Sequence, residues 1–206
     1  MGETAESSER VLGGVPTPAS YDVAAIAVVR SMVATVGMTL RRRIHQPRTT
    51  VGRVLRFADG TAARVYRVTA ADVAAVAAPC VLVVGFRLRR VHGFGHTLFR
   101  AESILNTPLF AGFPGFVSKL WLAHDGNGVY RGFYQWNGGA LADAYVRALW
   151  WVLALVSERE SIHYVVLRDL RRDDVLADPS VLDAIGPARR DAWWRLTAVE
   201  GASSSR

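Results

Sequence analysis

The feature that most constrains the fold is an aromatic-rich segment with a turn at its centre, GFPGFVSKLWLAHDGNGVYRGFYQW at positions 112–136. Two runs of aromatic and β-branched residues, Phe116–Ala123 and Val129–Trp136, flank the sequence DGNG at 125–128. Glycine and asparagine supply the positive φ angles that a tight turn needs, so this connector is typical of a β-hairpin. We therefore expect the two runs to be neighbouring antiparallel strands.

Further elements are expected on both sides of this hairpin. A strand-like run, Val81–Leu88, and a mostly helical segment, Gly95–Phe110, precede it. A long helical pattern, Ala140–Glu158, and another strand-like run, Ile162–Leu167, follow it. The order β-α-β-β-α-β predicts an α+β fold of the ferredoxin-like type.

Short motifs in the same region carry a resemblance to a known family. The sequence PGF at 114–116 is followed by Lys119 and Trp121, then by the turn and the aromatic strand, and then by a helix that opens with ADAY at 142–145. This pattern, over roughly residues 80–170, resembles the dimeric α+β barrel superfamily. Within the superfamily it is most similar to the antibiotic-biosynthesis mono-oxygenases and the YdhR-type mono-oxygenases.

The resemblance implies an architecture and an activity. In that superfamily two sheets pack face to face, so a homodimer is expected. The implied activity is that of a cofactor-independent mono-oxygenase acting on a hydrophobic polycyclic aromatic or polyketide-type small molecule. The substrate anion reacts with oxygen itself, while the protein binds, deprotonates and shields it. The alternatives are a non-catalytic small-molecule-binding or accessory protein of the same fold, and a peripheral membrane-associated protein.

The rest of the chain is expected to form extensions around this core. The first residues are rich in serine, glutamate, glycine and proline, a composition typical of disorder. The predicted organisation is a disordered tail at 1–19, an N-terminal helix and hairpin extension at 20–78, the ferredoxin-like domain at 79–170 and a C-terminal helical extension at 171–206.

Three elements are predicted within the N-terminal extension. A helix is expected over Ala24–Ile44, with Arg41-Arg42-Arg43 in its last turns, where cations interact favourably with the helix dipole. A hairpin is expected over Val51–Arg67, with Asp59-Gly60 at its turn. A short alanine-rich helix is expected over Ala70–Ala78.

The first of these helices is unusually apolar. Its span Val23–Leu40 has no polar residues except Arg30, two threonines and a serine. The span is near the length needed to cross a bilayer, but a central arginine is costly there. We favour a helix that docks on the protein or lies at an interface. The alternative is a helix on a membrane surface, with the arginine cluster at the lipid head groups.

Composition narrows the possible partners and the compartment. The formal net charge is +7 and the pI is near 10.3, which is compatible with nucleic acid or an anionic membrane as partner. The arginines are scattered, however, and RNA-binding aromatic signatures are absent, so we expect no nucleic-acid partner. The N-terminus is acidic and polar, unlike a signal peptide, so we expect a cytoplasmic protein. The single cysteine, Cys80, is expected to be a buried, inert thiol.

Lys119 is the most informative candidate for chemistry. By strand alternation it shares a face with Val117 and Trp121, and an ammonium group is expensive to bury without a partner. We interpret it as a group that stabilises a substrate phenolate or enolate while aromatic side chains stack on the substrate rings. The alternative is that Lys119 pairs with an acid, such as Glu102 or Asp143, or extends to the sheet edge.

The other site residues are chosen for their chemistry on predicted strands and at the first helix. The candidate catalytic residues are Lys119, His163 and Tyr134. His163 is included because a histidine on a core strand can be a general base near neutral pH. The alternative for His163 is a purely structural hydrogen bond. The candidate substrate-binding residues are Trp121, Trp136, Tyr130, Asn106 and His96.

No metal site and no cofactor are predicted. His92, His96 and His124 lie on different segments and lack the paired spacing of a zinc site. The sequence GFG at 93–95 is too short for a phosphate-binding loop, and no G-x-S-x-G motif is present.

Overall fold

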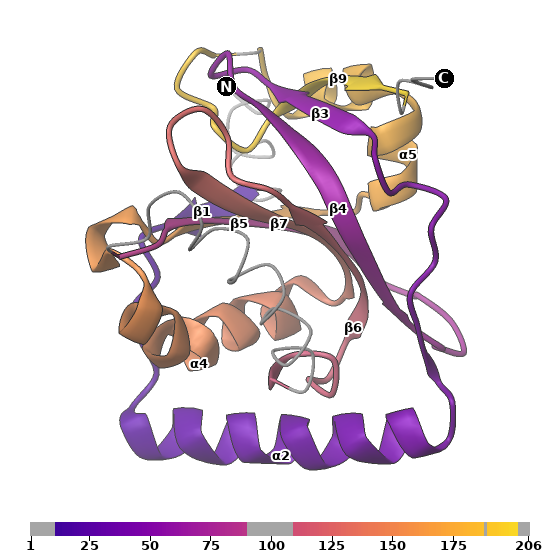
Figure 1. Cartoon of the computed structure of the whole chain (residues 1–206), viewed down its shortest axis with the longest axis vertical. Helices are drawn as coiled ribbons and strands as arrows, with labels where there is room; N and C mark the ends of the chain where they lie inside the picture. Colours follow the sequence, from indigo (N-terminus) through magenta and orange to yellow (C-terminus); the bar gives the residue numbers. More distant parts are fainter. Residues whose placement is uncertain (1–10, 90–108, 188, 202–206) are drawn as a thin grey trace, which may run out of the picture.

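A single curled antiparallel sheet organises the part of the chain that the computed structural model describes, residues 11–89, 109–187 and 189–201. Within these residues the sheet has nine strands in the order β1-β8-β5-β7-β6-β4-β3-β9, and the short strand β2 pairs with β4. Figure 1 shows β3 and β9 curling back over one face of the sheet, which gives it the form of a half-barrel. The strands are β1 (Val11–Gly14), β2 (Ile44–His45), β3 (Val54–Phe57), β4 (Ala62–Ala71), β5 (Pro79–Arg87), β6 (Phe116–Leu122), β7 (Val129–Asn137), β8 (His163–Arg168) and β9 (Leu196–Glu200).

The expected ferredoxin-like β-α-β-β-α-β fold is wrong. The strands assigned to it lie side by side as β8-β5-β7-β6, but the sheet continues past both ends, with β1 paired to β8 and β4 paired to β6. An open strand edge presents unpaired backbone N–H and C=O groups. Here β1 and β4, which are distant in sequence, pair with those groups. Segments predicted as extensions are therefore integral to one large sheet. Residues 95–108 of the first predicted helix lie outside the described residues.

One face of the sheet is covered by two stacked helices. These are α4 (Gly139–Val156), which lies against the sheet, and α2 (Tyr21–Leu40), which packs on the outer side of α4 (Figure 1). Tyr145 and Leu149 of α4 point into the core, as their spacing along a helix predicts. The core on this side also contains Leu82, Val84, Phe110, Phe113, Phe116, Trp121, Tyr134, Trp136 and Val166.

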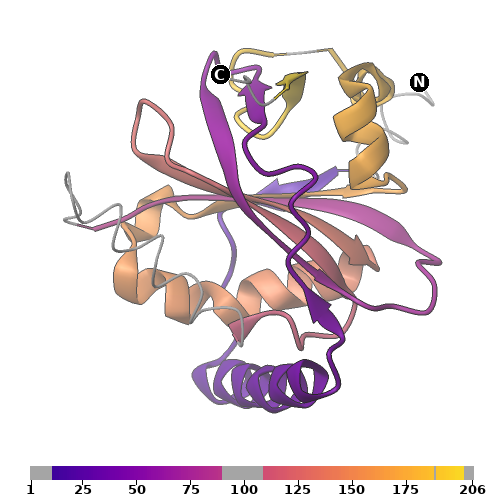
Figure 2. The same ribbon diagram turned by 45° about the vertical axis from the view of Figure 1, so that its right-hand side comes forward.

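The opposite face is covered by the chain itself. It packs against α5 (Arg172–Ala177), the 3-10 helix η3 (Pro179–Ile185) and the curled strands β3 and β9 (Figure 2). We expected a second chain to cover this face, because a sheet with helices on one side leaves the other side open. That reason for a face-to-face dimer does not hold in this fold, and the homodimer stays a prediction. The core here contains Leu55, Phe57, Val65, Val81, Val83, Leu120, Phe133, Leu167, Leu182 and Leu196.

Both predicted hairpins are confirmed. β6 and β7 pair antiparallel with Lys119 opposite Tyr134, and β3 and β4 pair antiparallel around Gly60, which has φ +81. A β-bulge between Phe116 and Ser118 changes one detail, because it breaks the strict alternation at the start of β6. Phe116 therefore joins the core on the face of Lys119, where we had expected Val117.

Several local predictions fail where pairing or chain ends intervene. The alanine-rich helix expected over Ala70–Ala78 is absent, because residues 70 and 71 end β4 and pair with β6 and β2, and tertiary pairing overrides helix propensity. Val11–Gly14, expected to be disordered, is β1. The helix α2 ends at Leu40, before the three arginines that we had placed in its last turns. The C-terminal extension, expected to be helical, ends in β9.

Candidate functional site

Lys119 lies on the central strand β6, between Thr69 of β4 and Tyr134 of β7. Only 7% of this residue is exposed. Its Nζ atom lies 3.3 Å from the ring centroid of Trp121, 4.6 Å from that of Phe110 and 4.8 Å from that of Tyr134. A cation over an aromatic ring is attracted by the partial negative charge of the ring face, and more strongly where water is excluded. The structure thus brings together the predicted residues Lys119, Trp121 and Tyr134.

A second basic side chain, Arg67 of β4, lies beside the same tryptophan. Its Cζ atom is 4.7 Å from the centroid of Trp121. Arg67 Nη2 and Trp121 Nε1 both donate hydrogen bonds to Thr69 Oγ1, over 3.3 and 3.1 Å. Arg67 and Thr69 are buried, like Lys119. We refer to Arg67, Thr69, Phe110, Lys119, Trp121, Tyr134 and Tyr145 as the cation–aromatic cluster.

Burial sets the protonation states in this cluster. It lowers the pKa of Lys119 well below the ordinary value of 10.5, and the nearby Arg67 guanidinium lowers that pKa further. The hydroxyl groups of Tyr134 and Tyr145 lie 3.2 Å apart, and burial raises the pKa of both far enough to keep them neutral. The cluster therefore combines a lysine whose lowered pKa favours the neutral amine with two neutral phenols.

The acids that we considered as partners of Lys119 are not found there. Asp143 accepts a hydrogen bond from the Tyr164 hydroxyl over 2.6 Å and lies 3.9 Å from Arg147 Nη1. Glu102 lies outside the described residues. Among the residues that the structure describes, Lys119 has no hydrogen bond or ion pair to a carboxylate. Its described surroundings are aromatic and cationic, which favours a neutral amine or an anionic guest.

A glycine makes room for the tyrosine of the cluster. Gly132 of β7 lies two residues before Tyr134 on the same face of the strand, opposite Trp121. A Cβ atom at Gly132 would lie 2.5 Å from the Tyr134 ring. The ring therefore rests over the bare backbone of its own strand, and any larger residue would displace it.

Trp136 and Tyr130 lie on either side of Tyr134 on the same face of β7. The rings of Trp136 and Tyr145 have centroids 4.8 Å apart, while Tyr130 stacks on Phe86 with centroids 6.0 Å apart. Both residues are buried. Trp136 therefore extends the aromatic surface of the cluster, while Tyr130 belongs to a separate stack.

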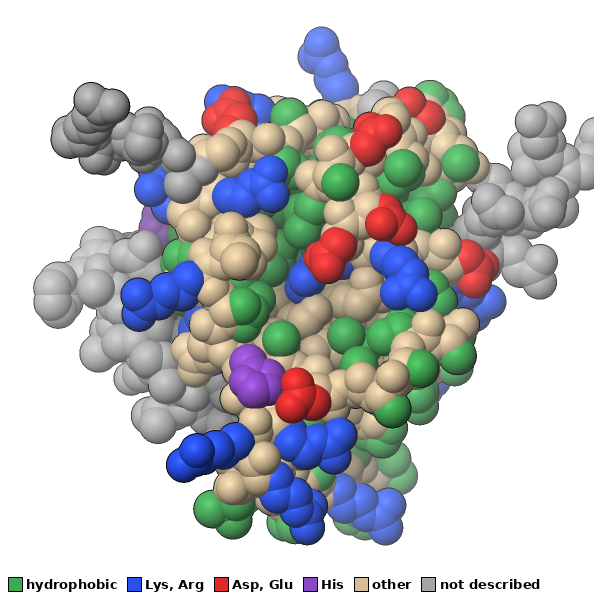
Figure 3. Space-filling view, turned by 90° about the vertical axis from the view of Figure 1, so that its right-hand side faces the viewer, with side chains coloured by type: hydrophobic (Ala, Val, Ile, Leu, Met, Phe, Trp, Pro, Cys, Tyr) green, Lys and Arg blue, Asp and Glu red, His purple; other side chains and the backbone are tan. Residues whose placement is uncertain are grey.

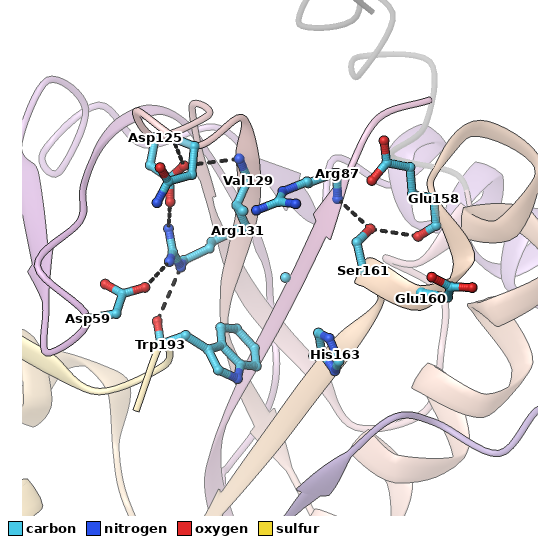
Figure 4. A pocket seen from close by; sticks show the side chains of 12 residues that line it. Asp59, Arg87, Asp125, Val129, Arg131, Glu158, Glu160, Ser161, His163 and Trp193 are labelled. Carbon is cyan, nitrogen blue, oxygen red and sulfur yellow. Dashed lines mark hydrogen bonds and ion pairs between the residues drawn. The ribbon is translucent and has the colours of Figure 1, made fainter. Parts of the chain in front are cut away.

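His163 is not part of this cluster. On β8 it alternates with Tyr164 and Val166, so it lies on the opposite face of the sheet from Lys119. There it lines a polar pocket of about 420 Å³, facing the Trp193 ring at a centroid distance of 6.4 Å (Figure 4). Lys119 and His163 therefore cannot act on the same atom. The pocket is lined further by Asp59, Arg87, Asp125, Arg131, Glu158, Glu160 and Ser161.

The charged groups on one side of this pocket are already paired. Arg131 donates a hydrogen bond to Asp125 Oδ2, a second to Asp59 Oδ2 over 2.8 Å and a third to the carbonyl of Trp193 over 3.2 Å (Figure 4). Asp125 Oδ1 also accepts the backbone N–H groups of Asn127 and Val129. This network connects both hairpin turns to the C-terminal segment. Its role is structural, because its donors and acceptors are engaged.

Sequence reasoning missed Arg67 and Thr69 as site residues. Both lie in a segment that we had treated as a separate extension, and only the pairing of β4 with β6 brings them beside Lys119. No local signal marks that pairing, although the alternation along β4 already indicated one buried face. His96 and Asn106, two predicted substrate-binding residues, lie outside the described residues.

Two further observations bear on what the chain could bind. Among the described residues, no group of three or more His, Cys, Asp or Glu side chains could hold a metal ion. Cys80 is buried as expected, and burial raises the pKa of its thiol to about 12.

Comparison of the chain with protein-family models, with curated proteins and with solved structures finds no match.

Proposed function

We propose that the chain binds a small aromatic molecule with an acidic hydroxyl or enol group in the cation–aromatic cluster, where Lys119 removes the proton. The observation that carries the proposal is the buried Lys119 amine, which lies against three aromatic rings and beside Arg67, without a carboxylate partner among the described residues. The lowered pKa keeps the amine neutral, so its lone pair is free to take a proton from a bound acid. Once protonated it is a cation in a dry site, where an anion is its natural partner.

The proposed chemistry uses each group of the cluster. The Lys119 amine takes the proton from the substrate oxygen, and the resulting ammonium group pairs with the phenolate or enolate that it has created. Arg67 adds a second positive charge that cannot be lost near neutral pH. The rings of Trp121 and Tyr134 offer faces on which an aromatic substrate stacks, and the Tyr134 hydroxyl can donate a hydrogen bond to the anion.

The reaction class that we propose is oxygenation without a cofactor. An electron-rich anion of this kind can react directly with dioxygen, as in the mono-oxygenases that the hairpin motif resembles. With anthrone, one oxygen atom replaces the two hydrogens of the methylene carbon as a carbonyl and the other leaves as water, so the substrate supplies all the electrons. The second candidate is a binding protein that holds the aromatic anion without turnover. The observation behind it is the cluster geometry itself: the rings of Trp121 and Tyr134 beside Lys119 can hold a flat anion whether or not dioxygen reacts with it.

Binding and ionisation can be tested with 2-naphthol, whose anion absorbs at longer wavelength than the neutral form. We expect the protein to shift bound 2-naphthol to the naphtholate spectrum at a pH where free 2-naphthol is neutral. A Lys119→Met variant should lose this shift. Arg64→Met is the matched control, because Arg64 is an exposed cation on β4, outside the cluster, and its loss should leave the spectrum unchanged.

Oxygen uptake separates the two candidate functions. With anthrone as probe, consumption of dioxygen that depends on Lys119 would support the enzyme. A naphtholate shift without oxygen uptake from anthrone would support the binding protein. A folded Lys119→Met variant that still ionises 2-naphthol would disprove the role of Lys119 in both.

A further inference from the structure

The outer face of α2 carries a row of large, exposed apolar side chains. Figure 1 shows that α2 is the outermost layer of the molecule on its side of the sheet. Five large side chains at alternating spacings of three and four residues form a stripe that faces away from α4, and between 52% and 80% of each is exposed. We refer to these residues, Ile26, Val29, Val33, Val36 and Leu40, as the α2 stripe.

The inward face of the same helix carries small residues. Ala24, Ser31 and Thr35 are the buried residues of α2, and they face the rest of the molecule. Gly112 approaches so closely that a Cβ atom there would collide with the carbonyl oxygen of Ser31. The small residues thus provide close docking, while the large residues face outward. A helix that docks by one face and presents large apolar side chains on the other is normally covered on both.

Apolar surface continues beside the helix. A groove of about 540 Å³ between α2 and α4 is lined by Val23, Phe113, Pro114 and Leu141, among others. Val23 and Leu141 are also counted among the exposed large apolar side chains. Contiguous exposed patches of this kind mark interaction sites in soluble proteins.

Positive charge lies next to this apolar face. Arg41, Arg42 and Arg43 follow α2 directly and are exposed, and Arg30 is exposed midway along the helix. Figure 3 shows Lys and Arg side chains gathered at the lower end of the molecule, with apolar side chains beneath them. Asp22, at the opposite end, is the only acidic residue of α2.

The backbone at the arginine cluster is unfavourable for an arginine. Arg42 has φ +54, in the left-handed position after the helix where glycine is preferred, and the N–H of Arg43 closes the turn by donating to the carbonyl of Met38. The turn itself would be better served by glycine. The requirements of the turn therefore do not explain why an arginine stands at position 42, which points to a role for its side chain.

We propose that α2 docks the protein on an anionic lipid bilayer, with the helix parallel to the surface, the α2 stripe among the lipid chains and the arginines at the head groups. Apolar contact and attraction to anionic lipids add in this type of binding. A second copy of the chain fits less well as the occupant. A two-fold axis through the middle of α2 would bring the two Arg30 side chains together, and each chain already carries a net charge of +7.

By length and composition α2 and α4 could each also cross a membrane. For α4 the packing argues against this, because it contributes Tyr145 and Leu149 to the core beneath the sheet. For α2 the inward contacts argue for lying on the surface, since crossing the bilayer would remove Ser31 and Thr35 from their buried positions.

The test is co-sedimentation of the full chain with vesicles. We expect binding to vesicles of phosphatidylglycerol and phosphatidylcholine, little binding to phosphatidylcholine alone, and release by high salt, which screens the charges. Substituting Arg41, Arg42 and Arg43 by Gln should weaken partitioning by roughly 100-fold, since each arginine near such a surface contributes about a factor of five. The control is Arg189→Gln with Arg190→Gln, which removes two exposed charges from the segment before β9; β9 lies on the other side of the sheet from α2 (Figure 1). Arg41→Gln with Arg42→Gln is the variant that matches it in charge.

The apolar contribution needs its own pair of variants. Val33→Asp, at the centre of the stripe, should abolish binding, whereas Leu155→Asp, at a somewhat more exposed position near the end of α4, should not. Arg42→Gly and Arg42→Ala separate charge from backbone. Both should weaken binding, but only the glycine variant should raise the melting temperature. Melting curves of all variants show whether they fold.

Three outcomes would overturn the proposal. Binding that is equally strong to neutral vesicles would remove the charge argument, and binding that high salt cannot reverse would indicate insertion. A dimer that Val33→Asp converts to a monomer, without vesicle binding by the original protein, would show that a second copy covers α2.

Discussion

Lys119 brings an ionisable group into the middle of a sheet. A buried cation–π contact contributes about 2 kcal/mol, while burying an unpaired ion costs several kcal/mol even after the protein relaxes. The rings of Trp121, Phe110 and Tyr134 therefore offset only part of the cost of a charged Lys119. The balance favours the neutral amine, in agreement with the lowered pKa. The cost of burying a charged Lys119 also favours an anionic guest, because the anion would supply the negative charge that a buried ammonium group lacks.

The first prediction at this scale concerns stability and pH. Since the pKa of Lys119 is lower in the folded state than in the unfolded state, the unfolded state binds more protons in the window between the two values. Stability must then rise with pH across that window, up to about pH 10.5 and by at most about 1.4 kcal/mol per unit. A Lys119→Met variant should lack this rise. Urea unfolding at several pH values below the range of tyrosine ionisation measures it.

The control for this prediction is Arg64→Met, which should keep the pH dependence of the original protein. If the curves for Lys119→Met and the original protein run parallel, Lys119 has an ordinary pKa in the folded state. The cluster would then hold a charged lysine.

The second residue-scale prediction concerns Gly132. A Gly132→Ala variant should be destabilised by about 1–3 kcal/mol, because the new Cβ meets the Tyr134 ring and the core must shift. It should also weaken the ionisation of 2-naphthol. Gly126→Ala is the control, since a Cβ atom at Gly126 meets nothing within 4 Å. Chemical denaturation measures both variants, and equal stabilities would contradict the predicted contact.

At the scale of elements, the two hairpins are coupled by a single side chain. Arg131 of β7 joins the turn that holds Asp59 to the turn that holds Asp125, and it also contacts the carbonyl of Trp193. The Asp125 side chain is fully buried, and that of Arg131 is 1% exposed. Such a buried pair is strongly interdependent, because either partner alone would be an uncompensated charge.

Removing the Arg131 guanidinium should therefore destabilise the folded state strongly. We expect Arg131→Met to lower the free energy of unfolding by about 3–5 kcal/mol, while Asp125→Asn made in the Arg131→Met background should cost much less than it does alone. Arg56→Met, which breaks an exposed ion pair with Glu200, is the control and should have little effect. Additive losses in the double variant would mean that the two side chains are not energetically coupled.

At the scale of the whole molecule, the sheet separates two cores with different properties. The core beneath α4 contains Lys119, Arg67 and most of the aromatic rings, whereas the core beneath α5 and η3 is largely aliphatic. The buried arginines on that second side, Arg131, Arg172 and Arg195, are hydrogen-bonded at its margins. The C-terminal segment closes the second core, with Leu182 and Leu196 fully buried. The chain thus covers both faces of its sheet without a second copy.

This closure predicts that the C-terminal segment is needed for folding. Leu182→Ala should lower stability by about 2–5 kcal/mol, because it leaves a cavity under η3. Val181→Ala, next to it and only partly buried, should cost clearly less. Thermal or urea unfolding measures both. If Leu182→Ala is tolerated without loss, the C-terminal segment is a peripheral addition, as the sequence-based division at residue 171 had it.

Local sequence was a good guide where contacts are local. The hairpin around 125–128, the hairpin around Gly60, the helix α4 and the buried position of Cys80 were all predicted, because turn chemistry and side-chain periodicity act over a few residues. The face shared by Lys119 and Trp121 followed from alternation along β6, whereas the register of β6 with β7 decided that Tyr134 joins them. The bulge at the start of β6 was not predictable, since it depends on how the strands fit together.

The tertiary structure alone decided which segments complete the sheet. Strand edges can be paired by any extended segment, so neither the pairing of β4 with β6 nor that of β1 with β8 follows from periodicity. That choice replaced the expected ferredoxin-like fold, brought Arg67 beside Lys119 and put His163 on the opposite face. The amino-acid sequence determined which side chains could form a charged aromatic site. Long-range strand pairing determined which of them meet, because it depends on the free energy of the whole sheet rather than of any one segment.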